Sequence, residues 1–213
     1  GSGMRGLIEY VPLRAIERAG VVLADRLRDV HSFEEIRQAF GDFYLSLLNY
    51  HAAVLHGRAS GWINKEPPYG RHADELFAMV PHGRLLVIAR DGRASALSMY
   101  RRGWMDSVRG CMERWGTFAR MTVEALEKVP PERVKLVRYE DLVRDFEPQL
   151  QNIHRFFSLP EPDFPSIYRA RETRLVPDPD SLEKWGESVD PEDIEWFSER
   201  YGNIMEQLGY SVE

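Results

Sequence analysis

The sequence predicts an α/β fold, with a parallel sheet flanked by helices and a helix-rich N-terminal part. Two runs of branched apolar residues, 84–89 and 134–139, have the composition of strands buried on both faces. Helical periodicity fills the stretches between and after them, and such alternation is typical of right-handed crossovers within one sheet. With 213 residues the chain can bury a full core, and we expect one domain over 4–213. Residues 1–3 resemble the remainder of an expression tag.

The N-terminal part is expected to be a helical scaffold over 13–55, because its apolar residues recur at spacings of three and four. Ser32 is predicted to cap the second of its helices, with Glu35 completing a capping box. A short first strand is expected over 61–66, where it runs into a loop stopped by two prolines. A helix is predicted next, over 71–80.

The remaining elements follow from apolar patterning and from turn residues. The second strand is expected at 84–89, followed by a helix that starts at Ala94, breaks near Gly103 and ends at Lys128. The third strand is expected at 134–139. We expect a helix over 140–157, an irregular proline-rich segment over 159–179, and an amphipathic helix over 191–208.

Composition excludes several classes of function. The net charge of −6 argues against nucleic acid as the main partner. The single cysteine, Cys111, excludes an internal disulfide and a cysteine-cluster metal site, and the six histidines show no metal-ligand spacing. No apolar run reaches the length needed to span a bilayer, and no signal peptide is recognisable. We therefore expect a cytoplasmic protein that binds no metal.

Polar and basic residues cluster at the predicted strand ends, where ligands bind in open α/β sheets. Ser98 lies early in the helix that follows Arg90, where free backbone N–H groups favour an anion. An arginine fork, a hydroxyl and a helix N-terminus predict a site for a phosphorylated small molecule. The alternative is a solvated turn with local ion pairs. The strand-end residues are Lys65 and Glu66 after the first strand, Arg90 and Arg93 after the second, and Arg138 and Tyr139 after the third.

Four segments together resemble the sulfotransferase family, in particular its bacterial and tyrosylprotein branches. The resemblance covers about residues 61–210, with the segments in the family's order and spacing. The segments are Asn64-Lys65-Glu66-Pro67, the stretch 85–99 around Arg90-Asp91-Gly92-Arg93, Val137-Arg138-Tyr139-Glu140-Asp141, and the tail with Ser181-Leu182-Glu183-Lys184-Trp185 and Gln207-Leu208-Gly209-Tyr210.

The resemblance implies a P-loop NTPase-like fold that binds 3′-phosphoadenosine-5′-phosphosulfate and transfers its sulfonate to a hydroxyl or amine of a small-molecule or peptide acceptor, without a metal. The product is adenosine 3′,5′-bisphosphate. The family pattern gives Lys65 the role of stabilising charge in the transition state. The cofactor-binding residues it implies are Arg90 and Ser98 at the 3′-phosphate, Arg93 also gripping the cofactor, Tyr139 near the nucleotide, and Lys184 and Trp185 closing over it.

The sequence departs from the family pattern in two places. No strand and loop of the type that cradles the 5′-phosphosulfate are recognisable before residue 61. Pro67 stands where the cytosolic branch places a catalytic histidine, so the base is sought among Glu66, Glu9, Glu17 and His72.

The sequence bears on two other classes of function. A sulfotransferase-like domain that binds nucleotide or a partner without transfer is favoured by the missing loop. A small-molecule kinase lacks support, because the sequence has no Gly-x-x-x-x-Gly-Lys-Ser/Thr.

Overall fold

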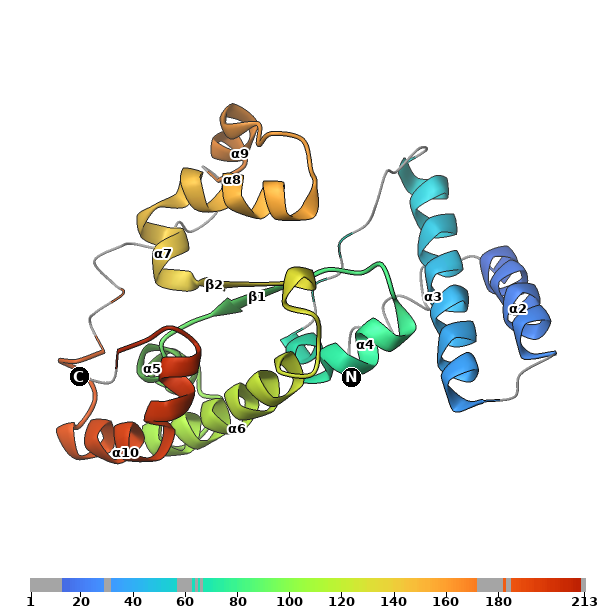
Figure 1. Cartoon of the computed structure of the whole chain (residues 1–213). Coiled ribbons are helices and arrows are strands. Elements are labelled where there is room, and N and C mark those ends of the chain that lie inside the picture. The colour runs from blue at the N-terminus through green and yellow to red at the C-terminus, as the bar shows by residue number, and fades with distance from the viewer. Residues whose placement is uncertain are drawn as a thin grey trace. The chain divides into compact units, whose positions relative to one another are not determined.

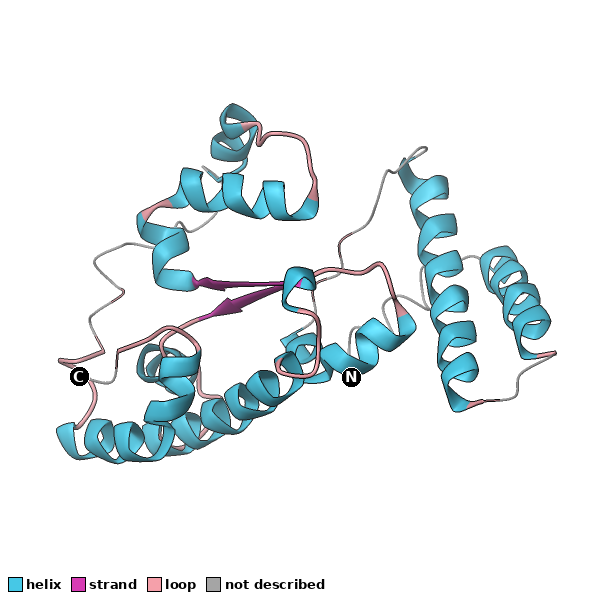
Figure 2. Cartoon of the chain, in the orientation of Figure 1, coloured by secondary structure: helices cyan, strands magenta, loops and turns pink. Residues whose placement is uncertain are grey.

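A computed structural model describes residues 13–28, 32–56, 63, 65, 67–171, 182 and 185–211. The chain divides into two compact units, Gly1–Gly83 and Arg84–Glu213. Helices make up most of both units, and the strands of the described part lie in the second (Figure 2). The expectation of one domain over 4–213 stays a prediction.

The first unit begins with two helices that pack side by side, α2 (Leu13–Leu27) and α3 (Phe33–His56) (Figure 1). The predicted capping box at the start of α3 is confirmed. The Ser32 N–H donates to Glu35 Oε2 at 3.0 Å, and the Glu35 N–H donates to Ser32 Oγ at 3.2 Å. Side chains thereby satisfy two of the free backbone N–H groups at the N-terminal end of α3.

The first unit continues with the 3₁₀ helix η1 (Pro67–His72) and α4 (Ala73–Met79). The predicted helix over 71–80 is therefore confirmed, although its first residues belong to η1. α4 packs on α3 at Gly41, where an added Cβ would lie 1.7 Å from the Met79 carbonyl oxygen. Only glycine allows the two backbones this approach.

The first predicted strand, 61–66, is wrong at Ile63 and Lys65, which belong to no strand; its other residues lie outside the described part. Pro67 and Pro68 open η1 instead. Proline fixes φ near the helical value and tolerates a first helical turn. The two prolines that are expected to end a strand therefore begin a 3₁₀ helix in the structure.

The second unit contains a parallel pair of strands, β1 (Leu85–Ala89) and β2 (Val134–Arg138), which are the strands predicted at 84–89 and 134–139. Their register runs from Leu85 opposite Val134 to Ala89 opposite Arg138. They are connected through α5 (Gly92–Arg101), α6 (Val108–Leu126) and η2 (Pro131–Arg133). This βαβ arrangement confirms the predicted α/β fold.

After β2 the chain forms α7 (Tyr139–Arg144) and α8 (Phe146–Phe157), where one helix over 140–157 was predicted. The helix is divided at Asp145, whose φ of −130° and ψ of 55° leave the helical region.

The prediction of an irregular segment over 159–179 is wrong for α9 (Phe164–Arg171). Asp163 accepts the Ser166 N–H at 3.2 Å and so caps this helix, while Pro165 occupies its first turn, where proline is tolerated. The aromatic rings of Phe164 and Tyr168 stack with centroids 6.2 Å apart. The side-chain cap and the aromatic packing therefore stabilise a helix in this segment despite its prolines.

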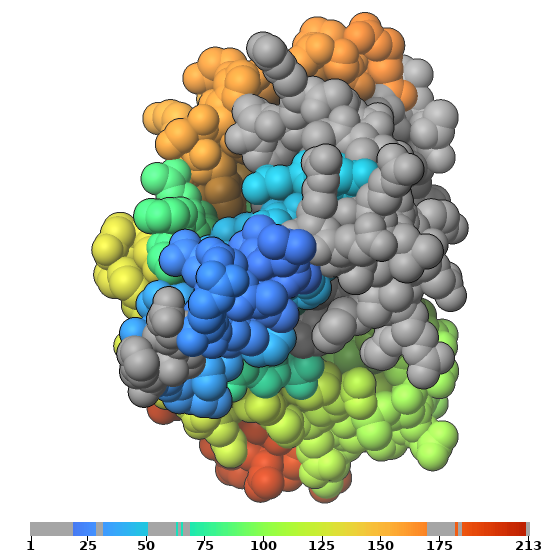
Figure 3. Space-filling view, turned by 90° about the vertical axis from the view of Figure 1, so that its right-hand side faces the viewer, coloured from blue at the N-terminus to red at the C-terminus, as the bar shows by residue number. Residues whose placement is uncertain are grey.

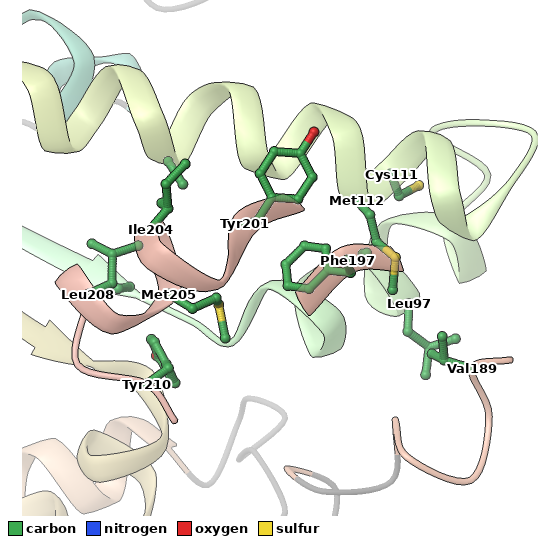
Figure 4. Packing of buried hydrophobic residues seen from close by; sticks show 13 residues of the cluster. Leu97, Cys111, Met112, Val189, Phe197, Tyr201, Ile204, Met205, Leu208 and Tyr210 are labelled. Carbon is green, nitrogen blue, oxygen red and sulfur yellow. The ribbon is translucent and has the colours of Figure 1, made fainter. Parts of the chain in front are cut away.

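The C-terminal helix α10 (Pro191–Gln207) agrees with the prediction over 191–208 and packs on α6 and α5. Figure 3 shows surface of α6 in yellow-green and of α10 in red, and Figure 4 shows the apolar side chains between these helices. At Gly116 an added Cβ would lie 2.1 Å from the ring of Tyr201. The largest fully buried side chains of the described part are Met112, Phe197, Met205 and Cys111.

None of the helices in the described ranges combines the length and the apolar character that crossing a membrane requires.

Candidate functional site

A pocket of about 220 Å³ lies within the second unit, where β1 leads into α5. Arginine side chains, one serine, one tryptophan and two apolar side chains line it. These lining residues are Arg90, Ala94, Leu97, Ser98, Arg101, Arg102 and Trp185. The combination of several cations with an aromatic ring suits an anionic ligand that also carries a flat ring.

The geometry of α5 explains why these side chains share one pocket. Arg90 directly follows β1, and Ser98 lies about two helical turns further along. Arg101 and Arg102 follow Ser98 by three and four positions, which places them on the same face of the helix. Sequence reasoning missed both arginines, although this spacing from Ser98 was the signal that could have identified them.

Arg90 holds a guanidinium group without a carboxylate partner among the described residues. Its Nε is buried and has no hydrogen-bond partner there. The guanidinium lies 5.0 Å from the ring centroid of Tyr139, which supports it by a cation–π contact. A buried N–H without a partner costs about 1 to 3 kcal/mol, so a ligand oxygen that reached Arg90 would remove this penalty.

Arg93, predicted from the sequence as a cofactor-binding residue, lies outside the described pocket lining. Its side chain is 7% exposed and pairs with Asp91, with Nε at 3.1 Å from Oδ1 and Nη2 at 2.7 Å from Oδ2. Its guanidinium also stacks on the indole of Trp185, 4.1 Å from the ring centroid. The local ion pair considered as an alternative for this turn is thus present at Arg93.

A buried hydrogen-bond network anchors Asp91. Its Oδ1 accepts the Arg93 N–H at 2.8 Å and so caps α5, while the Asp91 N–H donates to Glu140 Oε1 at 3.1 Å. The other oxygen of Glu140 accepts the Tyr210 hydroxyl at 2.6 Å. Burial and the neighbouring Glu140 carboxylate raise the pKa of Tyr210, so the phenol remains a donor. Sequence reasoning missed Glu140, which it treated as a helix-start residue.

The other predicted site residues have different surroundings. Tyr139 lies beneath Arg90 and outside the described pocket lining. Arg138 pairs with both carboxylate oxygens of Asp141 at 2.7 Å and donates to the Gly209 carbonyl at 2.8 Å. Lys65 is exposed and belongs to the first unit. Glu66 and Lys184 lie outside the described residues.

The base candidates outside the strand ends are placed only in part. The His72 Nδ1 lies 3.2 Å from a carboxylate oxygen of Glu75, its neighbour one turn away. Glu9 is outside the described residues, as is the side chain of Glu17.

A sequence model described as the sulfotransferase family matches residues 9–163, well over half of the chain. The chain belongs to the sulfotransferase family. The match includes β1, α5 and β2, and therefore most of the pocket. The resemblance that the sequence motifs indicated is thereby confirmed.

Curated relatives of this sulfotransferase-family chain include protein-tyrosine sulfotransferase A of Caenorhabditis elegans, 27% identical over 83% of the chain. Protein-tyrosine sulfotransferase 1 of Danio rerio is 31% identical over 50% of the chain. The alignments span 51% and 32% of these two proteins. The chain thus spans about half the length of the first relative.

Among solved structures, the sulfotransferase domain of the Synechococcus PCC 7002 olefin synthase superposes with a TM-score of 0.54 and 22% identity. The superposition covers 88% of this chain and 74% of that domain. At this identity the likeness establishes the fold alone, and it agrees with the predicted P-loop NTPase-like α/β architecture.

Proposed function

We propose that the chain transfers the sulfonate of 3′-phosphoadenosine-5′-phosphosulfate to a hydroxyl or amine acceptor. The observation that carries this proposal is the buried, unpartnered Nε of Arg90 in a pocket that also presents Ser98 and the indole of Trp185. A nucleotide with a 3′-phosphate supplies both an anion and a flat base, and the lining offers partners for each. Family membership supports the same ligand class.

The lining divides into two parts by chemistry. Arg90, Ser98 and Arg102 would hold the 3′-phosphate, because guanidinium groups and a hydroxyl donate charge-assisted hydrogen bonds to its oxygens. Trp185 and Leu97 would contact the adenine, because an aromatic face and an aliphatic side chain exclude water from a flat ring. Tyr139 supports the Arg90 guanidinium from below.

The bound donor supplies an activated sulfonate whose S–O bond to the 5′-phosphate breaks as an acceptor oxygen or nitrogen bonds to sulfur. We assign Lys65 the role of neutralising the negative charge that develops on the leaving phosphate oxygen. Glu66 would take the proton that the acceptor loses. These two assignments rest on the family resemblance of Asn64-Lys65-Glu66-Pro67.

The acceptor class to examine first is a peptide tyrosine, since the curated relatives are protein-tyrosine sulfotransferases. A small-molecule phenol is the matched alternative. Both present a phenolic oxygen, so the comparison isolates the contribution of the peptide backbone and of the flanking side chains.

Calorimetric titration with adenosine 3′,5′-bisphosphate tests the binding half of the proposal. Loss of a charge-assisted contact in Arg90→Ala should weaken binding by about 1.5 to 3 kcal/mol, and Ser98→Ala by about 0.5 to 1.5 kcal/mol. Arg155→Ala is the control, because Arg155 lies on α8 and bonds Asn152 instead of lining the pocket. Undetectable binding by the unaltered protein, or equal losses in the control, would contradict the assignment.

A transfer assay with radiolabelled donor tests the catalytic half. The unaltered protein should label a tyrosine peptide, and Lys65→Met should lower the rate about 10²- to 10³-fold, the usual effect of removing a group that stabilises transition-state charge. Nucleotide binding without labelling of any acceptor would support the alternative of an inactive nucleotide-binding domain.

A further inference from the structure

We propose that Arg93 is a positioning residue that holds the Trp185 indole as a stacking platform for the nucleobase. The proposal rests on the proposed nucleotide site, but it assigns Arg93 a role that differs from direct contact with phosphate. In this role Arg93 affects base recognition through Trp185, while Arg90 and Ser98 recognise phosphate.

The contacts of Arg93 leave its guanidinium fixed on both sides. Nε and Nη2 form a bidentate pair with Asp91, and the central carbon of the guanidinium lies over the Trp185 ring, 4.1 Å from its centroid. The side chains of Arg93 and Asp91 are 7% and 10% exposed, so the pair is shielded from water. A planar guanidinium in a bidentate pair has a fixed plane, and that plane orients whatever ring stacks on it.

Trp185 needs such support because it lies in a turn and not in a helix or strand. Its carbonyl accepts the N–H groups of Ser188 and Val189, both at 3.0 Å. Arg101 Nη2 donates to Ser188 Oγ at 3.1 Å and so ties this turn to α5. Trp185 lines the pocket and Arg93 does not, so of these two residues it is Trp185 that a ligand in the pocket would contact.

Direct phosphate binding by Arg93 would require a ligand to compete with a buried carboxylate. Breaking a buried bidentate pair leaves an uncompensated charge on Asp91 and is costly. The cap of α5 would be disturbed as well, because Asp91 also accepts the Arg93 N–H at 2.8 Å. The geometry therefore favours an indirect role, in which the pair stays intact when ligand binds.

A double-mutant cycle in the affinity for adenosine 3′,5′-bisphosphate tests this role. Arg93→Lys keeps the charge next to Asp91 but removes the planar group under the indole, and Trp185→Ala removes the platform. We expect Arg93→Lys to weaken binding about 3- to 10-fold and Trp185→Ala about 5- to 150-fold, the usual range for a base–aromatic stack. In the Trp185→Ala background, Arg93→Lys should change the affinity less than about twofold, because the two residues act as one unit.

Arg109 offers a matched control elsewhere in the second unit. Its guanidinium stacks on Trp196 at 5.0 Å and pairs with Asp193 at 2.6 Å, so Arg109→Lys makes the same chemical change away from the pocket. Thermal unfolding of both lysine variants reports whether they fold. Arg109→Lys should leave nucleotide affinity unchanged.

A probe without a base separates positioning from general damage to the site. Inorganic pyrophosphate, measured by thermal shift at millimolar concentration, should bind Arg93→Lys and the unaltered protein equally. Additive losses of nucleotide affinity in the double-mutant cycle would overturn the positioning role, and so would a loss of pyrophosphate affinity in Arg93→Lys as large as its loss of nucleotide affinity. Nucleotide binding by the unaltered protein would still support the proposed function in either case. Absence of nucleotide binding by the unaltered protein would overturn both.

Discussion

Arg90 and Arg93 stand three residues apart at the end of β1, yet their guanidinium groups have opposite surroundings. Arg93 is buried, pairs with Asp91 and stacks on Trp185. Arg90 lines the pocket with a buried Nε that has no hydrogen-bond partner among the described residues. The same residue type thus has two different environments within four residues of sequence. The paired arginine stabilises the fold, and the unpaired arginine is available to a ligand.

The largest expected effect is a loss of stability when the ion pair between Arg93 and Asp91 is broken. Asp91→Ala removes the carboxylate that neutralises Arg93 and the side chain that caps α5. We expect the free energy of unfolding to fall by about 3 to 5 kcal/mol, as when one partner of a buried ion pair is lost. Urea unfolding followed by circular dichroism measures it. Asp163→Ala, which removes the exposed cap of α9, is the control and should lower the free energy of unfolding much less than Asp91→Ala does. If Asp91→Ala and Asp163→Ala lowered the free energy of unfolding equally, the buried pair of Arg93 and Asp91 would stabilise the fold no more than an exposed helix cap does. That result would contradict the contrast between Arg93 and Arg90.

Gly116→Ala tests the packing of α10 on α6 and changes neither arginine. The added Cβ would lie 2.1 Å from the Tyr201 ring, so either this buried ring or the two helices must shift. Overpacking of this kind costs about 1 to 3 kcal/mol of unfolding free energy. Gly103→Ala is not a suitable control because its φ is +69°. Gly20→Ala is preferable, since nothing lies within 4 Å of its Cβ position. An unchanged unfolding midpoint in Gly116→Ala would contradict the close α6–α10 packing.

Arg90→Ala should change stability little, in contrast to Asp91→Ala. The substitution removes a buried donor that lacks a partner, so the free energy of unfolding should stay within about 1 kcal/mol or rise. The same urea experiment, run without nucleotide, measures the change. A loss of more than about 2 kcal/mol would show that Arg90 contributes to the fold in the way Arg93 does.

The smallest expected effect is a pH dependence of the unfolding free energy that is caused by Tyr210. The Tyr210 hydroxyl donates to Glu140, which also accepts the Asp91 N–H. Burial and the Glu140 carboxylate raise the pKa of Tyr210 in the folded state. The stability that this shift contributes is fully present below about pH 10, the usual pKa of tyrosine, and declines as pH rises above it. Tyr210→Phe should flatten the decline in unfolding free energy between about pH 9 and 11, while Tyr100→Phe, at an exposed position, should not. An equally steep decline in Tyr210→Phe would contradict the assignment.

Sequence patterns predicted the part of the candidate pocket that depends on regular geometry. Arg90 and Ser98 follow from a strand end and a helix with a known repeat, and β1, β2 and α10 follow from periodicity. The patterns could not tell a paired arginine from an unpaired one, because the partner of Arg93 is fixed by side-chain conformations and burial. Glu140 was missed for a similar reason, since it acts across 49 residues of sequence on the Asp91 N–H.

The proline signals show the other limit of sequence reasoning. Proline was interpreted as ending a strand before residue 67 and as breaking helices over 159–179. In the structure Pro67 lies in η1 and Pro165 lies in the first turn of α9. Proline has the same fixed φ in a turn and at a helix start, so its effect depends on the capping and packing that follow.

Selectivity for the 3′-phosphate is the most direct test that Arg90 belongs to a nucleotide site. Calorimetry would compare adenosine 3′,5′-bisphosphate with adenosine 5′-monophosphate on the unaltered protein and on Arg90→Ala. We expect the 3′-phosphate to strengthen binding to the unaltered protein at least about tenfold, and Arg90→Ala to lose most of that preference. Equal affinities for the two nucleotides in the unaltered protein, or a full preference retained in Arg90→Ala, would contradict the account.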